Sequence, residues 1–174
     1  VTGVKRVLIG GSARRMKETV GDADFIVATS DAKKVMDFFA SMPEVIHVYS
    51  RGKAKVLVRL KTGMDADLEV VEEKSFGAAS QYFTGNKDHN VELRRVAISK
   101  GWKLNEYGVF KGEKYLFGAE EEEVYEKLGM KWIPPELREH IGEIELAMKG
   151  KLPELIPYKS LKGDLHTHSN WTDG

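Results

Sequence analysis

The chain has 174 residues, of which 41% are apolar and 31% charged, and this globular composition excludes wholesale disorder. No apolar run approaches the ~20 residues that span a bilayer, and residues 1–9 lack the apolar length and cleavage site of a secretory signal, so we expect no membrane association. The absence of cysteine excludes disulfides and thiolate chemistry and favours the cytoplasm, and the balance of 27 basic and 27 acidic residues excludes a generally basic coat for nucleic acid.

The first seventy residues alternate between strand-like and helix-like patterns. Apolar and β-branched runs separated by turn signals predict strands at 4–9, 23–28, 45–50, 54–60 and 65–71. Gly10-Gly11-Ser12 is expected to open a short helix, and Ser30 or Asp31 to cap a second helix that Pro43 ends. Strands and helices are therefore interleaved in this part of the chain.

From residue 75 the pattern becomes mainly helical. We expect Ser75 to cap one helix and a longer helix to run to about Lys100. Short strands or a hairpin are expected within 103–117. The acidic run from Glu120 to Glu123 indicates the solvated first turn of a further helix, where negative charge is favoured.

The region after residue 130 is expected to hold a last helix and a linker. Pro134-Pro135 begins the helix, because proline is tolerated in a first helical turn. Its apolar stripe is Leu137, Ile141, Ile144 and Met148. Pro153 and Pro157 then mark a linker, and no internal repeat or low-complexity tract is found along the chain.

The sequence Gly11-Ser12-x-Arg14-Arg15 lies between a predicted strand and a predicted helix. Glycine lets the backbone approach a phosphate closely, and the backbone N–H groups, the serine hydroxyl and the arginines can donate to it. The same residues also suit a tight turn with surface arginines. The motif alone is therefore a weak indication of a phosphate site.

Two acidic patterns follow on predicted strands. Asp22-x-Asp24 places two carboxylates on one face, because residues two apart in a strand point the same way. Asp65-x-Asp67-x-Glu69 does the same on a later strand, and periodicity does not choose between Asp65 and Asp67 as the partner of the first pair. Three carboxylates can hold two divalent ions ~3.5–4 Å apart for phosphoryl transfer, whereas the first pair alone also suits an exposed strand end.

The order and spacing of these motifs resemble those of the nucleotidyltransferases of the DNA polymerase beta superfamily. More narrowly, residues 4–27 resemble the palm of bacterial and archaeal family X DNA polymerases. The resemblance continues through residues 81–110, where Tyr82-Phe83-Thr84-Gly85 and Asn105-Glu106-Tyr107 match family signatures. It covers residues 1 to about 150.

The resemblance implies roles for individual residues. Asp22, Asp24 and Asp67 match the catalytic aspartates that hold two Mg²⁺ or Mn²⁺ ions with the dNTP. The implied nucleotide-binding residues are Gly11, Ser12, Arg15, Tyr82, Phe83, Thr84, Gly85 and Asn90. Arg94 matches a residue that contacts the DNA template strand. Glu69 stands where the family commonly has arginine, so the family's charge balance around Asp67 does not carry over.

The resemblance also implies an α+β fold, in which a nucleotidyltransferase-type palm with a mixed sheet backed by helices precedes a smaller helix-and-hairpin lobe. Residues 1–73 are expected to form the palm, 74–150 the nucleotide- and template-binding subdomain, and 151–174 a linker with the first strand of a truncated PHP domain. The implied reaction is attack of a primer 3′-hydroxyl on the α-phosphate of a dNTP. Primer-template or gapped DNA would be the partner, gap filling in DNA repair the role, and the protein a monomer.

The PHP assignment comes from the segment 163–169, which contains His166 and His168. Two histidines two apart on a strand can point at one metal ion. The segment resembles the first metal motif of the PHP (polymerase and histidinol phosphatase) phosphoesterase domain, which follows the polymerase in bacterial and archaeal family X enzymes. Because this motif alone supplies too few ligands, we expect no competent phosphoesterase site and poor order in residues 163–174.

Two other functions stay open at this point. One is a nucleotidyltransferase that modifies RNA or a small molecule with the same phosphate cradle, which the signatures at 82–85 and 105–107 disfavour. The other is a catalytically weak palm fragment that only binds DNA, which the intact aspartates disfavour. His89, near the implied nucleotide site, is interpreted as a structural residue rather than a substrate contact.

Overall fold

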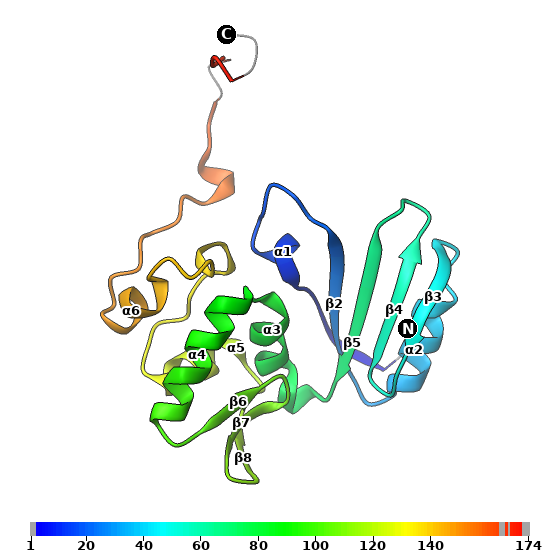
Figure 1. Cartoon of the computed structure of the whole chain (residues 1–174), viewed down its shortest axis with the longest axis horizontal. Helices are drawn as coiled ribbons and strands as arrows, with labels where there is room; N and C mark the ends of the chain where they lie inside the picture. Colours follow the sequence, from blue (N-terminus) through cyan, green and yellow to red (C-terminus); the bar gives the residue numbers. More distant parts are fainter. Residues whose placement is uncertain (1–2, 164–165, 167, 172–174) are drawn as a thin grey trace.

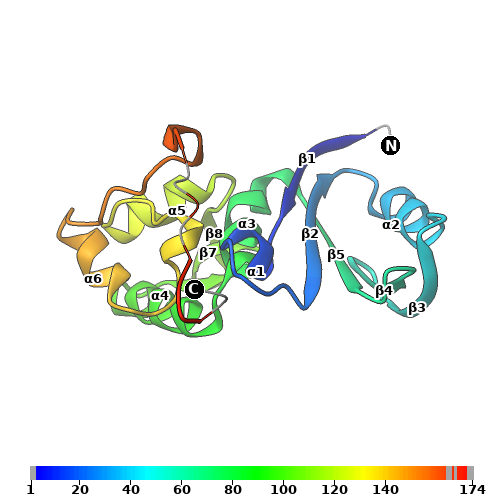
Figure 2. The same ribbon diagram turned by 90° about the horizontal axis from the view of Figure 1, so that it is seen from above.

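A computed structural model describes residues 3–163, 166 and 168–171, and places two units side by side (Figure 1). The first unit is a five-stranded sheet with helices α1 (Gly11–Arg14) and α2 (Ala32–Ala40). The second unit is mainly helical and includes a three-stranded sheet. Figure 2, turned by 90°, shows α1 at the junction of the two units and α2 at the far side of the first. The predicted α+β fold class is confirmed.

The sheet of the first unit is mixed, as predicted. Its strands are β1 (Val4–Ile9), β2 (Asp22–Thr29), β3 (Val45–Arg51), β4 (Lys55–Leu60) and β5 (Asp65–Val71). The order is β1-β2-β5-β4-β3, in which β2 and β5 run parallel and the other neighbours antiparallel. The crossover from β2 to β5 therefore contains α2, β3 and β4.

One face of this sheet is packed against α2. Val27 of β2 and Leu68 of β5 lie in one buried cluster with Val35 and Phe39 of α2. The helix begins at Asp31, whose side chain accepts a hydrogen bond from the Lys34 N–H at 3.0 Å, so Asp31 rather than Ser30 is the cap. Alternation along the strands then turns the intervening residues to the opposite face.

The opposite face is covered only in part, by the first helix of the second unit, α3 (Phe76–Thr84). Ile26 and Ala28 of β2 and Val71 of β5 pack there against Phe76 and Ala79. The acidic residues lie on the same face, nearer the starts of β2 and β5, beyond the part that α3 covers. This leaves the acidic end of the sheet open to a ligand.

The second unit has its own core. After α3 come α4 (Lys87–Ser99), β6 (Lys103–Asn105), β7 (Gly108–Lys111), β8 (Lys114–Phe117), α5 (Glu121–Leu128) and α6 (Glu143–Met148). Single 3₁₀ turns lie at Glu73–Ser75, Pro135–Leu137 and Tyr158–Ser160. Leu93, Ala97, Tyr125 and Ile144 are among the buried residues that join these elements. Residues 151–163 lead away from the unit (Figure 1).

One predicted helix cap and one predicted helix differ from the structure. The helix α3 begins directly after Ser75, as predicted, but Ser75 makes no side-chain capping bond, because its hydroxyl instead donates to the Tyr107 carbonyl at 2.8 Å. The helix expected from Pro134 is broken into a 3₁₀ turn and α6, and Ile141 of the expected apolar stripe is 76% exposed. The cause is Glu143, whose carboxylate accepts the backbone N–H groups of His140 and Ile141 and so stabilises a loop there.

Candidate active site

Three predicted metal ligands lie on the parallel strands β2 and β5. Their register pairs Asp22 with Asp65 and Asp24 with Asp67. Paired residues of neighbouring strands share a face of the sheet, so both pairs and Glu69 face away from α2. Asp65 is held by Arg59, whose Nε lies 2.7 Å from its Oδ1. Asp67 lies directly opposite Asp24 in the register and is therefore its nearer match.

The charge balance at this end of the sheet favours a cation. Burial, followed by the negative charges of Asp22, Asp67 and Glu69, raises the pKa of Asp24 to about 6. Oδ2 of Asp67 accepts a hydrogen bond from Lys55 Nζ at 2.6 Å, while its Oδ1 is buried without a partner in the described part of the chain. Unpaired carboxylate oxygens are the donors that Mg²⁺ prefers. The residues present thus fit a divalent ion in donor chemistry and charge.

The side chains are not already gathered as a ligand set. Among residues 3–163, 166 and 168–171, no three His, Asp or Glu side chains are grouped so that they could hold a metal ion. The backbone register nevertheless keeps Asp24 and Asp67 on adjacent strands at the same level of the sheet.

The Gly10-Gly11 turn lies directly against Asp24. The Gly10 N–H donates to the Asp24 carbonyl at 2.8 Å. Gly11 has φ +59°, and a Cβ placed there would lie 2.0 Å from Oδ2 of Asp24. Glycine is therefore required at Gly11 for both conformation and space. Ser12 follows in α1, half-buried beside the same carboxylate-lined end of the sheet.

A cleft of about 330 Å³ adjoins this turn and gathers most of the predicted nucleotide-binding residues. It is lined by Arg15, Tyr82, Phe83, Thr84, Gly85, Asn86, Lys87, Asn90 and Arg94. The Asn90 amide is fixed from both ends, because its oxygen accepts from Gln81 Nε2 at 2.6 Å and its nitrogen donates to the Tyr82 carbonyl at 2.7 Å. The cleft is thus bounded by Arg15 at the end of α1, by α3 and α4, and by the turn between those two helices.

Arg15 is oriented by two acceptors at the edge of the cleft. Its Nη1 donates to the Thr84 carbonyl at 2.5 Å and its Nε donates to Glu139 at 2.9 Å. Glu139 also accepts from Asn86 Nδ2 at 3.1 Å and lies 3.6 Å from Lys17 Nζ. Burial alone would raise the pKa of Glu139, but Arg15, Asn86 and Lys17 outweigh it and lower that pKa. No local pattern in the sequence marks Glu139 as part of this site.

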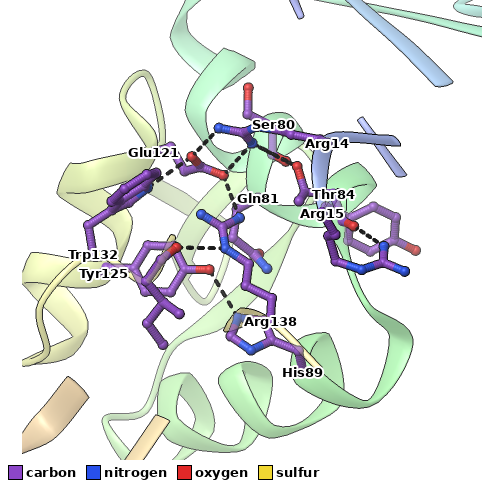
Figure 3. Close-up of polar contacts among 12 residues, drawn as sticks. Arg14, Arg15, Ser80, Gln81, Thr84, His89, Glu121, Tyr125, Trp132 and Arg138 are labelled. Carbon is purple, nitrogen blue, oxygen red and sulfur yellow. Dashed lines mark hydrogen bonds and ion pairs between the residues drawn. The ribbon is translucent and has the colours of Figure 1, made fainter. Parts of the chain in front are cut away.

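A second buried ion cluster joins the two units behind the cleft (Figure 3). Arg14 donates to both carboxylate oxygens of Glu121, at 2.8 and 2.7 Å, and to the Thr84 hydroxyl at 2.7 Å. Glu121 also accepts from Arg138 at 2.7 Å and from the Trp132 indole at 3.0 Å. Burial opposes ionisation of Glu121, but Arg138 and Arg14 dominate and lower its pKa to about 2.

Glu121 therefore corrects the prediction that the whole acidic run is solvated. It is 5% exposed, whereas Glu120 and Glu122 on either side are exposed. Its burial is stabilised by the guanidinium groups of Arg14 and Arg138. Both partners are distant in sequence, so the residues near Glu121 give no indication of its burial.

His89 is a structural residue, as predicted, and is fully buried. Burial, despite the opposing effect of Glu143, lowers its pKa, so the ring is neutral. Its Nδ1 lies 2.6 Å from Glu143 and its Nε2 lies 3.0 Å from the Tyr125 hydroxyl. A neutral tautomer that donates from Nδ1 and accepts from the tyrosine hydroxyl satisfies all three groups. His89 thereby joins α4 to α6.

The two predicted PHP histidines lie far from this site along the chain. The rings of His166 and His168 have centroids 4.8 Å apart, and both residues are exposed. Asp164, Leu165 and Thr167, between and before them, lie outside the described residues, as do residues 172–174. The predicted phosphoesterase motif is therefore described only in part. None of the helices in the described ranges is long and apolar enough to cross a membrane.

Comparison with known proteins gives consistent matches. A family model for the DNA polymerase beta thumb matches residues 79–139. The "DNA polymerase/3'-5' exonuclease PolX" of Bacillus subtilis (strain 168) is 39% identical over 169 residues, which cover 94% of this chain and 29% of that protein. "Repair DNA polymerase X" of African swine fever virus is 26% identical over 148 residues, which cover 77% of this chain and 82% of the viral protein.

A solved structure shows the same fold. The crystal structure of Leishmania infantum polymerase beta in a ternary P/T complex matches with a TM-score of 0.67 and 27% identity. The match covers 76% of this chain and 67% of that one. The present chain spans less than a third of the Bacillus protein, and the match covers nearly all of the present chain. Together with the strand register of the aspartates and the cleft beside them, these matches show that the chain belongs to family X of the DNA polymerases.

Proposed function

We propose that this chain is the catalytic part of a DNA-directed DNA polymerase that adds dNMP to a primer 3′-hydroxyl, with gap filling in DNA repair as its role. The observation that carries the proposal is the juxtaposition of Asp24 and Asp67, in parallel register, with the Gly10-Gly11 turn and the cleft that Arg15 lines. Carboxylates can bind divalent ions, and a glycine turn lets a phosphate come close to backbone N–H groups. The two features side by side suit phosphoryl transfer.

Asp22, Asp24 and Asp67 would hold the two divalent ions, Mg²⁺ or Mn²⁺. These ions, when bound, stabilise charge on the attacking and leaving oxygens. The Gly11 backbone, Ser12 and Arg15 bind the triphosphate. Asp67 accepts the proton of the primer 3′-hydroxyl, since it lies opposite Asp24 in the strand register and its Oδ1 has no hydrogen-bond partner in the described part of the chain.

The remaining cleft residues bind the rest of the nucleotide and the template. Tyr82, Phe83, Thr84 and Gly85 form the wall beside the sugar and base, and Asn90, held rigidly by Gln81, reads the base edge. Arg94 contacts the template strand. Catalysis in this proposal is mainly positioning and electrostatic stabilisation.

The domain limits and partners belong to the same proposal. Residues 1–73 form the palm, 74–150 the nucleotide- and template-binding subdomain, and 151–174 lead into a PHP domain that begins with His166 and His168. The partners are a dNTP and primer-template or gapped DNA, the protein acts as a monomer, and it works in the cytoplasm. Crystal structures of Leishmania infantum polymerase beta as a ternary P/T complex and as a ternary gap complex support the choice of DNA partner.

The test is primer extension on gapped DNA by Asp24→Asn, with Asp37→Asn as the matched control. Asp37 lies on α2, across the sheet from the site, and pairs with Lys33 and Arg51 at the surface. Loss of an essential ligand should reduce extension by at least about a thousandfold, or roughly 4 kcal/mol of barrier. The control should stay within about twofold. Extension of RNA ends but not gapped DNA would favour the other nucleotidyltransferase class, and DNA binding without extension by the wild type would favour a binding fragment.

A further inference from the structure

Lys55 is the cation that the structure places on a proposed metal ligand. It lies on β4 opposite Glu69 in the antiparallel register with β5. Its ammonium is 2.6 Å from Oδ2 of Asp67 and 2.9 Å from Oε1 of Glu69, so one cation bridges two carboxylates. Within the described residues, no other ion pair involves Asp22, Asp24 or Asp67.

The two carboxylates that share Lys55 differ in their proposed roles. Asp67 is proposed to bind divalent ions, whereas Glu69 lies two residues further along the same face, farther from the paired Asp22 and Asp24 end. Both side chains are largely buried, at 18% and 14% exposed, while that of Lys55 is 46% exposed. A flexible four-carbon stem lets the ammonium swing between neighbouring acceptors.

A divalent ion on Asp67 and an ammonium on the same carboxylate repel each other. An ion on the unpaired Oδ1 of Asp67 therefore weakens the interaction of Oδ2 with the ammonium and favours its transfer to another acceptor. Glu69 is already within hydrogen-bond distance of it, so the displaced ammonium keeps a charged partner and is not left unpaired. The residue that replaces the family's usual arginine thus has a specific use in this chain.

We propose that Lys55 is the internal counter-cation of the metal site, and that Glu69 is the carboxylate that receives it when a divalent ion takes Asp67. Lys55 and Glu69 are positioning residues in this account, and neither is a metal ligand. The proposal rests on the proposed function, because it assumes that Asp67 binds the ion. It predicts that Lys55 opposes metal binding and that Glu69 relieves this opposition.

The experiment measures Mn²⁺ affinity of the whole chain by electron paramagnetic resonance of free Mn²⁺, without DNA or dNTP. Lys55→Met should bind Mn²⁺ roughly three- to tenfold more tightly than the wild type, since a partly exposed competing charge is removed. Lys53→Met is the matched control, because Lys53 is an exposed lysine two positions earlier, and it should change affinity by less than about twofold.

A double-mutant cycle tests the role of Glu69. Glu69→Gln should weaken Mn²⁺ binding several-fold in the wild-type background, because Lys55 then stays on Asp67. In the Lys55→Met background the same change should matter by less than about twofold. Equal losses in both backgrounds would show that Glu69 acts on the metal directly, and would overturn its proposed role.

The remaining outcomes separate this inference from the proposed function. Unchanged or weaker Mn²⁺ binding by Lys55→Met, with that variant folded by circular dichroism, overturns the counter-cation. If Asp24→Asn binds Mn²⁺ as well as the wild type, the metal site itself is wrongly assigned. If Asp24→Asn loses Mn²⁺ while Lys55→Met behaves as the wild type, only the present inference fails.

Discussion

Arg14 and Glu121, 107 residues apart, form a bidentate ion pair, with 2.8 Å from Nη1 to Oε1 and 2.7 Å from Nη2 to Oε2. Arg14 ends α1, directly after the Gly10-Gly11 turn, and Glu121 begins α5 in the second unit. The pair therefore fixes the turn beside Asp24 relative to α5, which packs against α3 at the cleft. Bidentate geometry adds directional precision that a single hydrogen bond lacks.

Removal of the Glu121 carboxylate should strongly destabilise the fold. Glu121→Ala leaves Arg138, which is fully buried, without its charged partner. Breaking one side of a buried ion cluster costs about 3–5 kcal/mol in the free energy of unfolding, which urea titration measures. Glu122→Ala, at the exposed next position, should stay within about 0.5 kcal/mol. A loss below about 1 kcal/mol for Glu121→Ala would show that the cluster does not stabilise the fold.

The same carboxylate predicts an acid-sensitive stability. The folded-state pKa of Glu121, about 2, lies below the ordinary value of about 4.3 for an unfolded glutamate. Its contribution is therefore fully present above the unfolded pKa and lost as the pH falls towards 2. Urea unfolding at pH 7, 5, 4 and 3 should show declining stability, and Glu121→Gln should flatten that decline. A Glu121→Gln curve parallel to the wild-type curve would contradict the assignment.

Arg15→Ala should weaken dNTP binding. Glu139 and the Thr84 carbonyl engage Nε and Nη1, and they hold the guanidinium at the edge of the cleft. Loss of hydrogen bonds to a charged group costs about 1.5–3 kcal/mol, so the dissociation constant from calorimetry should rise by roughly 10- to 150-fold. Arg95→Ala, at a side chain 70% exposed and outside the cleft, is the control. Full rescue by Arg15→Lys would argue against a planar, two-sided contact.

Gly11→Ala tests the close approach of the turn to Asp24. The added Cβ would lie 2.0 Å from Oδ2 of Asp24, so that carboxylate must move. Gly63→Ala is the matched control, because Gly63 has φ +83° and nothing within 4 Å of its Cβ position. Both variants should lose about 1 kcal/mol of stability to backbone strain. Only Gly11→Ala should lose primer extension, by more than about tenfold, and equal activity of the two variants would contradict the geometry.

The strands and the acidic motifs could be predicted because their patterns are local. Alternation placed Asp22 and Asp24 on one face, and turn residues delimited each strand. Alternation alone could not choose between Asp65 and Asp67, and only the family resemblance favoured Asp67, because the choice depends on the β2–β5 register and on Arg59 of the neighbouring strand β4. Strand pairing between distant segments leaves no periodic signal in either one.

The residues that the sequence did not reveal are acidic ones with distant partners. No local pattern in the sequence marks Glu121, Glu139 or Glu143 as a carboxylate with a specific partner. Each is instead held by arginine, histidine or backbone N–H groups from elsewhere in the fold. Glu143 also interrupts the predicted last helix, because its carboxylate accepts hydrogen bonds from backbone N–H groups that precede α6. A buried charge is recognisable only when its partner is known.

The candidate active site can form only after β2 has paired with β5, so the proposed activity requires a completely folded sheet. A slip of one residue between these strands would turn Asp67 towards α2 and expose Leu68. The carboxylate pair and the hydrophobic core under α2 therefore require the same strand alignment. The crossover through α2, β3 and β4 must be finished before the two strands can meet, and such non-local contacts form slowly. Partly assembled molecules should consequently lack the aligned carboxylates, so the proposed activity should appear only together with the complete sheet.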